Sequence, residues 1–255
     1  MMDRLPSGAE LRFGNGEQLT GHEAIFPILT KHNDGSLQFL ATGFFIAKFG
    51  LFVTAKHVVF RSEFEVYENL IAIYQWNGSY IIRDIDVRHL AWHDKADIVI
   101  GCLPEMTHNL SEQIVFNKVA TLTRRIPAIG EITSTFAFPT TTVKNEEQVQ
   151  RIYLNDSWYF GNVEQHYPHG RDRTLLPGAC FQTSMAILGG ASGGPVFDKY
   201  GRVYAINSTS FSNGPPTFVS SVLDSLEIVL PENCDPRLTV AELAQMNFVA
   251  IEEDS

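Results

Sequence analysis

A serine surrounded by small residues is the first candidate for chemistry in this sequence. Residues 189–196 read GGASGGPV, so that four glycines flank Ser192. Glycine is costly in regular structure because it loses more backbone freedom on folding than any other residue. The segment is therefore either a tight turn that contains a serine, or a bent backbone on which N–H groups and one hydroxyl converge. A serine hydroxyl becomes a useful nucleophile at neutral pH only beside a base that has its own orienting partner.

A histidine and an aspartate with suitable surroundings precede this serine. His57 follows the apolar run LFVTA, and Asp97 opens the apolar stretch DIVIGCL. The alternatives for the orienting carboxylate are Asp84, Asp86 and Asp94. These three lie in polar stretches that are typical of turns and strand edges. We prefer Asp97, because a carboxylate at the mouth of a buried strand is desolvated beside its histidine.

Short β-strands are the elements that would position these residues. Apolar runs alternate with turn signals, as in EAIFPILT before the Asn33–Gly35 turn and LIAIYQW before Asn77-Gly78. Asn-Gly and Asp-Gly between apolar runs predict hairpins, and many short strands at this spacing predict barrels or sandwiches. Thr239 with Glu242 forms a capping-box pattern, which predicts one helix at about 239–247.

The strand pattern divides into two β-rich halves, with a soft boundary near 121–130. We expect an irregular lead-in over 1–20, one β-barrel over 21–125, a second over 126–230, and a helix with a solvated acidic tail over 231–255. A chain of 255 residues that is 44% hydrophobic can bury a full core. One large domain of two lobes is therefore expected rather than two independent domains.

The charge of the chain disfavours several classes of partner. The formal net charge is −10, and the short arginine pairs 124–125 and 171/173 are interpreted as solvated surface charge. An acidic chain without a dense basic stripe is a poor match for nucleic acid or an anionic membrane surface. No secretory signal peptide is predicted, and no apolar run is long enough to span a bilayer.

Neither a disulfide nor a metal site is predicted. The three cysteines, an odd and sparse set, are interpreted as packing residues: Cys102, Cys180 and Cys234. A reducing compartment, the cytoplasm, is expected from this interpretation. Two histidine pairs have a spacing that could bind zinc on a helix: His89 with His93, and His166 with His169. Both regions read as strand or loop without a third ligand, so surface histidines are the favoured interpretation.

Three blocks of the sequence resemble a known enzyme family. ATGFFIAKFGLFVTAKHVV, ADIVIGCL and FQTSMAILGGASGGPVF are similar to the signature blocks of chymotrypsin-fold serine proteases. The nearest group is the bacterial trypsin-like one that includes the HtrA proteases. The resemblance covers about residues 22–222 and implies an all-β fold of two antiparallel six-stranded barrels. The chain after residue 222 is too short for the PDZ domain that HtrA proteins usually carry.

The resemblance also implies roles for the residues found above. Ser192 would be the nucleophile, His57 the general base and then acid, and Asp97 the orienting carboxylate. The backbone N–H groups of Gly190 and Ser192 would form the oxyanion hole. Ala191 replaces the acidic residue that pairs with a new N-terminus in many secreted members, so activation by N-terminal insertion is not expected. Such an enzyme cleaves protein or peptide substrates without a cofactor.

Substrate preference follows from positions counted from Ser192. The resemblance predicts a primary specificity pocket formed by Ala186, Ile187, Leu188, Ser208, Thr209 and Ser210. None of these residues is charged, so a buried Arg or Lys side chain of the substrate would have no partner there. We therefore expect a preference for small or medium apolar side chains at the cleaved position.

Two hypotheses for the function remain. The first is a cytoplasmic serine endopeptidase that works through an acyl-enzyme. The second is a catalytically silent or partner-switched protease fold that acts as a recognition or regulatory module. The presence of all three predicted triad residues favours the enzyme, and a regulatory protein partner is compatible with both.

Overall fold

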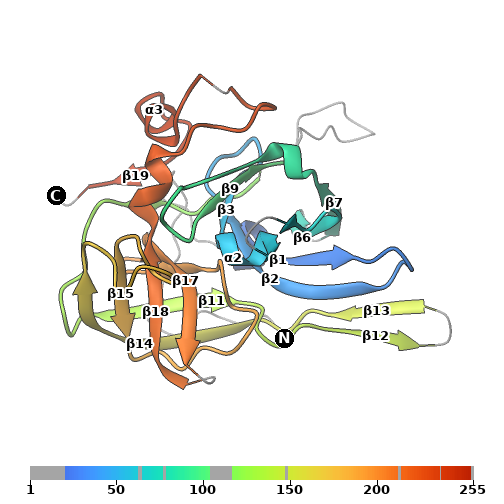
Figure 1. Cartoon of the computed structure of the whole chain (residues 1–255), viewed down its shortest axis with the longest axis horizontal. Helices are drawn as coiled ribbons and strands as arrows, with labels where there is room; N and C mark the ends of the chain where they lie inside the picture. The colour runs from blue at the N-terminus through green and yellow to red at the C-terminus, as the bar shows by residue number, and fades with distance from the viewer. Residues whose placement is uncertain are drawn as a thin grey trace.

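Two large β-sheets, two small two-stranded sheets and a few short helices form the described part of the chain (Figure 1). The computed structural model describes residues 21–62, 65–76, 79–103, 117–146, 149–211, 214–235 and 237–253. The predicted irregular lead-in at 1–20 and the predicted turn at Asn77-Gly78 lie outside these residues. Strands dominate, as the alternation of apolar runs and turn signals predicts.

The first sheet contains seven strands in the order β7-β6-β1-β2-β3-β9-β8. Their bounds are β1 Ile25–Lys31, β2 Leu37–Phe45, β3 Leu51–Thr54, β6 Leu70–Trp76, β7 Ser79–Ile85, β8 Leu90–Trp92 and β9 Val99–Cys102. The predicted hairpin at Asn33–Gly35 is confirmed, because β1 and β2 pair antiparallel around it and Gly35 has a φ of +82°. Shorter elements complete this half: α1 Gly21–Ala24, α2 Lys56–Val59, β4 Phe60–Ser62, β5 Glu65–Val66 and η1 Val87–His89.

The second sheet has the order β16-β11-β14-β15-β18-β17-β10-β19, and β16 also pairs with β17. This extra pairing closes six of its strands into a barrel. The bounds are β10 Leu122–Thr123, β11 Ile132–Ala137, β14 Ser157–Tyr167, β15 Cys180–Thr183, β16 Pro195–Phe197, β17 Val203–Phe211, β18 Gly214–Ser221 and β19 Ile251–Glu252. The predicted all-β, two-lobed fold is confirmed, with the first sheet a half-barrel whose end strands β7 and β8 do not pair with each other within the described residues.

A separate hairpin extends from the second half toward the first. Strands β12 Thr142–Glu146 and β13 Val149–Tyr153 lie beside the β1–β2 hairpin in Figure 1. The Gln150 side chain accepts a hydrogen bond from Leu37 N at 2.8 Å and donates one to Gly35 O at 2.8 Å. One glutamine therefore fastens the two hairpins together by satisfying backbone groups of the first.

The largest hydrophobic cluster lies between the two sheets. It joins Phe44 and Val53 of the first sheet to Phe197 and Ile206 of the second. Each of these side chains is at most 1% exposed. Burial of apolar surface is the main favourable term in folding, so this shared core holds the two lobes in a fixed relation.

The C-terminal segment crosses both lobes. Helix α3, Val240–Gln245, is confirmed where the sequence predicts it, with Thr239 and Glu242 forming the capping box. The expected solvated tail is wrong for the described end of the chain: Ile251 and Glu252 form β19, which pairs parallel with β10. Two donors of β10 supply the reason, since the Leu122 backbone N–H donates to Ala250 O and the Thr123 hydroxyl donates to Glu252 O, each at 2.9 Å.

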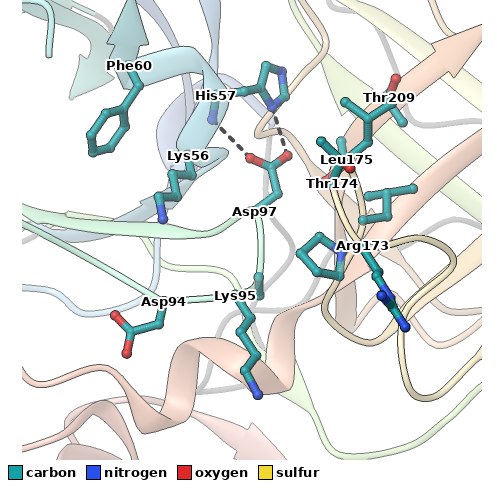
Figure 2. Close-up of a pocket in the computed structure, with 14 residues that line it drawn as sticks. Lys56, His57, Phe60, Asp94, Lys95, Asp97, Arg173, Thr174, Leu175 and Thr209 are labelled. Carbon is teal, nitrogen blue, oxygen red and sulfur yellow. Dashed lines mark hydrogen bonds and ion pairs between the residues drawn. The ribbon is translucent and has the colours of Figure 1, made fainter. Parts of the chain in front are cut away.

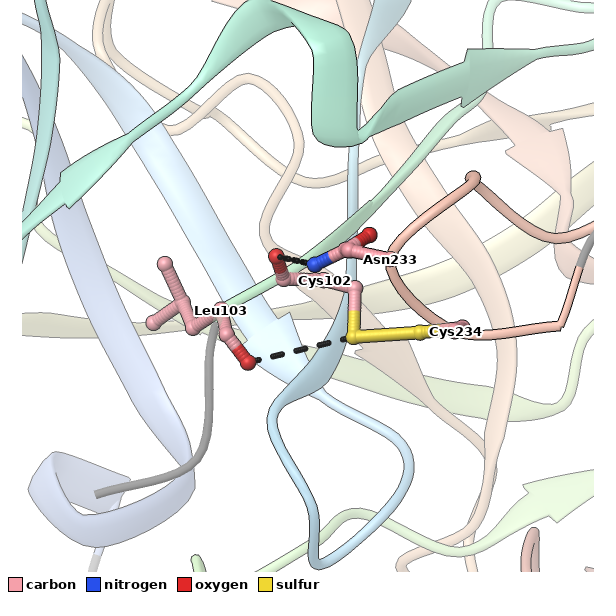
Figure 3. Close-up of a disulfide and its surroundings, with 4 residues drawn as sticks. All are labelled: Cys102, Leu103, Asn233 and Cys234. Carbon is pink, nitrogen blue, oxygen red and sulfur yellow. Dashed lines mark hydrogen bonds between the residues drawn. A yellow bond between two sulfur atoms is a disulfide. The ribbon is translucent and has the colours of Figure 1, made fainter.

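Cys102 and Cys234 correct the interpretation of the cysteines. The two residues form a disulfide between the end of β9 and the C-terminal segment (Figure 3). Asn233 Nδ2 donates a hydrogen bond to Cys102 O at 2.9 Å, which aligns the two stretches beside the bond. Cys180 is unpaired and buried, as predicted, and burial raises the pKa of its thiol to about 11. The expectation of a reducing compartment rested on unpaired cysteines, and this pairing removes that support.

Replacing Cys234 by serine tests the weight of this disulfide. The bond spans 132 residues of sequence, so it removes many conformations from the unfolded chain. Cys234→Ser is expected to lower the free energy of unfolding by about 2–4 kcal/mol in the absence of reductant. Denaturant titration measures this, and excess reductant should bring the wild type to the variant's stability. Equal stability of the two proteins without reductant would contradict the assignment.

Arg125 corrects the interpretation of the basic pairs. Its side chain is 12% exposed and forms ion pairs with Glu131 and with Asp198, whose side chain has no exposed surface. Arg202 Nη2 also lies 2.8 Å from Asp198 Oδ2. Arg124, by contrast, is half-exposed beside Glu253, as a surface charge. The pair at 124–125 is therefore one surface residue and one buried structural residue, which composition alone does not separate.

Candidate active site

His57 and Asp97 meet at one end of the first sheet. His57 lies in the short helix α2 directly after β3, and Asp97 lies two residues before β9, the strand that pairs with β3. The His57 Nδ1 atom is 2.8 Å from Asp97 Oδ2, and the His57 backbone N–H donates to Asp97 Oδ1 at 2.9 Å (Figure 2). Both carboxylate oxygens are therefore bound to His57. Of the four aspartates considered from the sequence, Asp97 is the one whose carboxylate the structure places against His57.

The carboxylate determines both the tautomer and the pKa of the histidine. An ionised carboxylate only accepts hydrogen bonds, so Nδ1 must carry the proton and Nε2 is left as the acceptor. Desolvation opposes protonation of the ring, but the hydrogen bond and the negative charge of Asp97 outweigh it and raise the pKa of His57 above its usual value. The His57 side chain is 48% exposed, so Nε2 is accessible as a base.

Ser192 lies on a loop of the second sheet that packs against the segment carrying His57. Its carbonyl accepts a hydrogen bond from Thr42 N at 3.0 Å. Gly193 has a φ of +78°, and a Cβ added there would stand 2.7 Å from Ala55 N, two residues before His57. In the described part of the chain, no hydrogen bond joins the Ser192 hydroxyl to His57. The structure thus brings His57 and Asp97 into direct contact and sets the serine loop beside them.

Two backbone N–H groups on this loop are available to a ligand. Gly190 has a φ of +89°, a conformation that disfavours any residue with a side chain. Across the described residues, neither the Gly190 N–H nor the Ser192 N–H donates a hydrogen bond. Unpaired backbone donors are uncommon away from water, and a pair on a glycine-rich bend can bind negative charge. Residues 189–196 therefore form a bent backbone with available N–H groups rather than a tight turn that merely contains a serine.

Thr42 of β2 is a residue that the sequence reasoning missed. Its hydroxyl donates to Gly190 O at 3.1 Å and accepts from Phe138 N at 3.2 Å. Its own carbonyl accepts from the Thr54 hydroxyl at 2.8 Å. Thr42 has no exposed surface. It therefore ties the Gly190 carbonyl, which lies along the chain between the Gly190 and Ser192 N–H groups, to the first lobe. In the sequence, the feature that could have indicated this role is a polar threonine inside the apolar run ATGFFIA.

Removing the Thr42 hydroxyl tests whether this contact positions the loop. In Thr42→Val the Gly190 carbonyl loses its donor, so the stretch between the Gly190 and Ser192 N–H groups loses this tether to the first lobe. For the endopeptidase that the sequence predicts, we expect kcat for a peptide substrate to fall about tenfold, the equivalent of one net hydrogen bond, with KM nearly unchanged. Thr42→Ser keeps the hydroxyl and should restore kcat. Steady-state kinetics on the three proteins decide this, and a wild-type kcat in Thr42→Val would rule out the positioning role.

Asn207 of β17 holds the same loop from the second lobe. Its backbone carbonyl accepts from Gly193 N at 2.8 Å, and its backbone N–H donates to Gly194 O at 2.9 Å. The side-chain Nδ2 donates to Ala191 O at 3.2 Å. Asn207 is only 2% exposed. A buried amide with these contacts fixes the residues on both sides of Ser192, and a polar residue inside VYAIN marks it in the sequence.

A cavity of about 660 Å³ opens beside His57 and Asp97 (Figure 2). Of the residues predicted for the primary specificity pocket, Ser208 and Thr209 line this cavity. The others lie elsewhere or are not described at the side chain. Ala186 and Leu188 are exposed, and Ser210 belongs to β17. Ile187 is 3% exposed and packs in the core of the second barrel, so its side chain offers no surface to a substrate.

Clusters of metal-ligating side chains and membrane-spanning helices were both sought among the described residues. Residues 21–253, apart from the short undescribed gaps, contain no group of three or more His, Cys, Asp and Glu side chains arranged around a metal position. None of the helices described is long and apolar enough to cross a membrane. His93 is instead structural, since its Nδ1 accepts from Ala96 N at 2.7 Å and shapes the turn before Asp97.

Comparison with known proteins identifies the family. Residues 41–206, which contain His57, Asp97 and Ser192, match the model of the trypsin-like peptidase domain. The chain belongs to this family. The match begins in β2 and ends in β17, so this peptidase domain includes the strands from both sheets that carry the site.

Solved structures with a fold similar to that of this trypsin-like peptidase include Deg5, the HtrA-type protease AlgW and Rv3671c. Deg5 has a TM-score of 0.57 at 17% identity, with 79% of this chain and 84% of that chain covered. The HtrA-type protease AlgW with decapeptide has a TM-score of 0.51 at 16% identity, covering 79% of this chain and 62% of that one. An inactive form of Rv3671c from M. tuberculosis H37Rv has a TM-score of 0.52 at 16% identity, covering 80% and 83%. No curated protein matches the chain. At these identities the likeness establishes the fold.

Proposed function

We propose that this trypsin-like peptidase is a serine endopeptidase in which Ser192, His57 and Asp97 are the catalytic residues. The observation that carries the proposal is the two-point bond between His57 and Asp97 beside a loop with unpaired N–H groups. A base with a fixed tautomer, a hydroxyl on a facing loop and donors for an oxyanion are the parts that acyl transfer requires. Membership of the peptidase family supports the same reading.

The proposed reaction has two halves. His57 Nε2 takes the proton of the Ser192 hydroxyl while the oxygen attacks the peptide carbonyl carbon. The oxyanion that forms accepts hydrogen bonds from the N–H groups of Gly190 and Ser192. The carbon–nitrogen bond then breaks, His57 gives its proton to the leaving amine, and an acyl-enzyme remains. Water, deprotonated by His57, hydrolyses the ester and restores Ser192.

The substrate preference proposed at the cleaved position is small or medium apolar. The residues proposed to surround this side chain carry no charge, and Ala186 and Leu188 lie exposed near the serine loop. An uncharged pocket leaves a basic substrate side chain without a partner, which is unfavourable. Ser208 contributes a neutral wall, because its hydroxyl is occupied by the Ser220 hydroxyl at 2.7 Å.

Labelling with a fluorophosphonate probe tests the proposed function. The probe reacts with a serine only where the base and the oxyanion donors are assembled around it. We expect the wild type to be labelled and Ser192→Ala to remain unlabelled. Ser36→Ala, which removes a hydroxyl from the β1–β2 turn, is the matched control and should label normally. A folded wild type that takes up no probe would contradict a constitutive enzyme and favour a partner-switched or silent fold.

A further inference from the structure

The walls of the cavity beside His57 are unusually basic for this chain. The protein has a formal net charge of −10, yet Lys56, Lys95 and Arg173 line the cavity against the carboxylates of Asp94 and Asp97. Both carboxylate oxygens of Asp97 are bound to His57, so Asp97 is not available to pair with these cations. Asp94 is the one carboxylate lining the cavity that does not bind His57. The cavity is therefore a local positive region on an acidic protein.

Two of the cations are available to a ligand. Lys95 and Arg173 are exposed, and within the described residues neither forms an ion pair with a carboxylate. Arg171, two residues before Arg173, instead pairs with Asp172 at 2.9 Å and stacks on Phe218. Lys56 is already engaged, because its Nζ donates to His93 O at 3.2 Å. Lys95 of the first lobe and Arg173 of the second thus each bring to the cavity lining a charge that no carboxylate neutralises in an ion pair within the described residues.

The position of the cavity indicates which part of a substrate would reach it. Ser208 and Thr209 of β17 line the cavity and also belong to the proposed pocket for the residue at the cleaved bond. The cavity therefore continues on the acyl side, toward the N-terminal part of the substrate. In the view of Figure 2, the charged ends of Lys56, Lys95 and Arg173 all lie beyond Asp97 from the His57 ring. A substrate side chain would meet the positive charge at a distance from the cleaved bond.

We propose that this cavity is a subsite for an acidic side chain, two to four residues N-terminal to the cleaved bond counting the cleaved residue as the first. The inference rests on the proposed endopeptidase function. Leu175 and Pro177 give the cavity an apolar wall on which the methylenes of a glutamate can pack, with Lys95 and Arg173 facing its carboxylate. The preferred substrates are then acidic segments that end in a small apolar residue, and complementary charge also speeds their association.

Pairs of peptides that differ only by a carboxylate in place of an amide test this subsite. Each pair has a fixed small apolar residue at the cleaved bond and either Glu or Gln at one of the three preceding positions. At one of these positions, we expect kcat/KM for Glu to exceed that for Gln by about three- to tenfold at low salt. The ratio should approach one at about 1 M salt, because exposed charges are then screened.

Charge variants locate the effect. Lys95→Gln and Arg173→Gln should each lower the Glu-to-Gln ratio about threefold and leave hydrolysis of the Gln peptide unchanged. Arg237→Gln removes a cation from the C-terminal segment outside the cavity and should leave the ratio as in the wild type. Equal cleavage of Glu and Gln at all three positions would overturn the subsite while leaving the endopeptidase proposal intact.

A binding measurement keeps the two proposals distinguishable. Fluorescence anisotropy with Ser192→Ala reports peptide binding without turnover. Tighter binding of the Glu peptide than of the Gln peptide, lost in Arg173→Gln, supports the subsite even where no peptide is hydrolysed. If the folded wild type cleaves neither peptide and labels with no probe, the catalytic proposal fails. Equal binding of both peptides would end the subsite proposal in that case too.

Discussion

Asp97→Asn is expected to lower kcat/KM for a neutral peptide by about 10⁴-fold, with the fold intact. The amide can still accept from the His57 backbone N–H through its oxygen. Its NH₂ group then faces Nδ1 and can only donate, so the ring takes the tautomer that carries the proton on Nε2. A base with its proton on the wrong nitrogen cannot activate Ser192. The expected loss of activity therefore arises from the position of one proton on the His57 ring rather than from displaced side chains.

The pH dependence of the two proteins provides a second measurement. Because Asp97 raises the pKa of His57, the histidine stays protonated and inactive to a higher pH than an ordinary histidine, whose pKa is about 6.5. The acidic limb of kcat/KM in the wild type should therefore lie above that value. Removing the charge in Asp97→Asn should move the limb to lower pH. A limb that moves upward, or does not move, would contradict the assigned coupling.

Asp94→Asn is the matched control for this variant. Asp94 lies three residues earlier on the same loop, is exposed, and lines the same cavity. We expect its replacement to change kcat/KM for a neutral peptide by less than about threefold, as for other exposed charges. If Asp94→Asn were the more damaging of the two, the orienting carboxylate would have been assigned to the wrong aspartate.

Gly193→Ala is expected to cost more than about 3 kcal/mol of folding stability. The alanine would have to adopt a φ of +78°, and its Cβ would collide with Thr54 Oγ1, the Thr42 carbonyl and Ala55 N. These are backbone atoms and a buried hydroxyl, which cannot swing aside. Either β2 separates from the Ser192 loop or the chain unfolds. Thermal and urea denaturation of the variant would measure the loss.

Gly130→Ala separates the two causes of that loss. Gly130 has a similar φ of +86°, but an added Cβ there meets nothing within 4 Å. Its replacement should cost only the backbone strain, about 1–2 kcal/mol. The difference between the two variants then measures the close approach of the two lobes at Gly193. If both variants lost equal stability, the close packing beside the serine would carry no energetic weight.

The sequence carries the local parts of this site clearly. Each residue of the site is recognisable from its immediate neighbours in the sequence. An apolar run precedes His57, a buried strand follows Asp97, and glycines flank Ser192. The Thr239 capping box and the Asn33–Gly35 turn are local in the same sense, and both are found in the structure. Patterns of this kind need only a few adjacent residues to be recognised.

Contacts between distant parts of the chain could not be predicted in this way. Thr42 and Gly190 are 148 residues apart, and Cys102 and Cys234 are 132 apart. In the sequence Arg173 is one charge in a polar loop, and only the fold brings it to the lining of the same cavity as Lys95. Ile187 was predicted to line the specificity pocket because of its position in the sequence relative to Ser192. Sequence position does not reveal side-chain direction, and the Ile187 side chain is buried in the core of the second barrel.

The C-terminal segment has a consequence for how this protein unfolds. It contacts the first lobe through the Cys102 disulfide and the Val249–Ala47 bridge, and the second lobe through β19. Neither lobe can unfold without breaking its contacts with this segment, which is also bound to the other lobe. Chemical denaturation should therefore follow a single cooperative transition instead of two successive ones. The same contacts hold the proposed base, His57, and the proposed nucleophile, Ser192, within one folded unit, which keeps their effective concentration high.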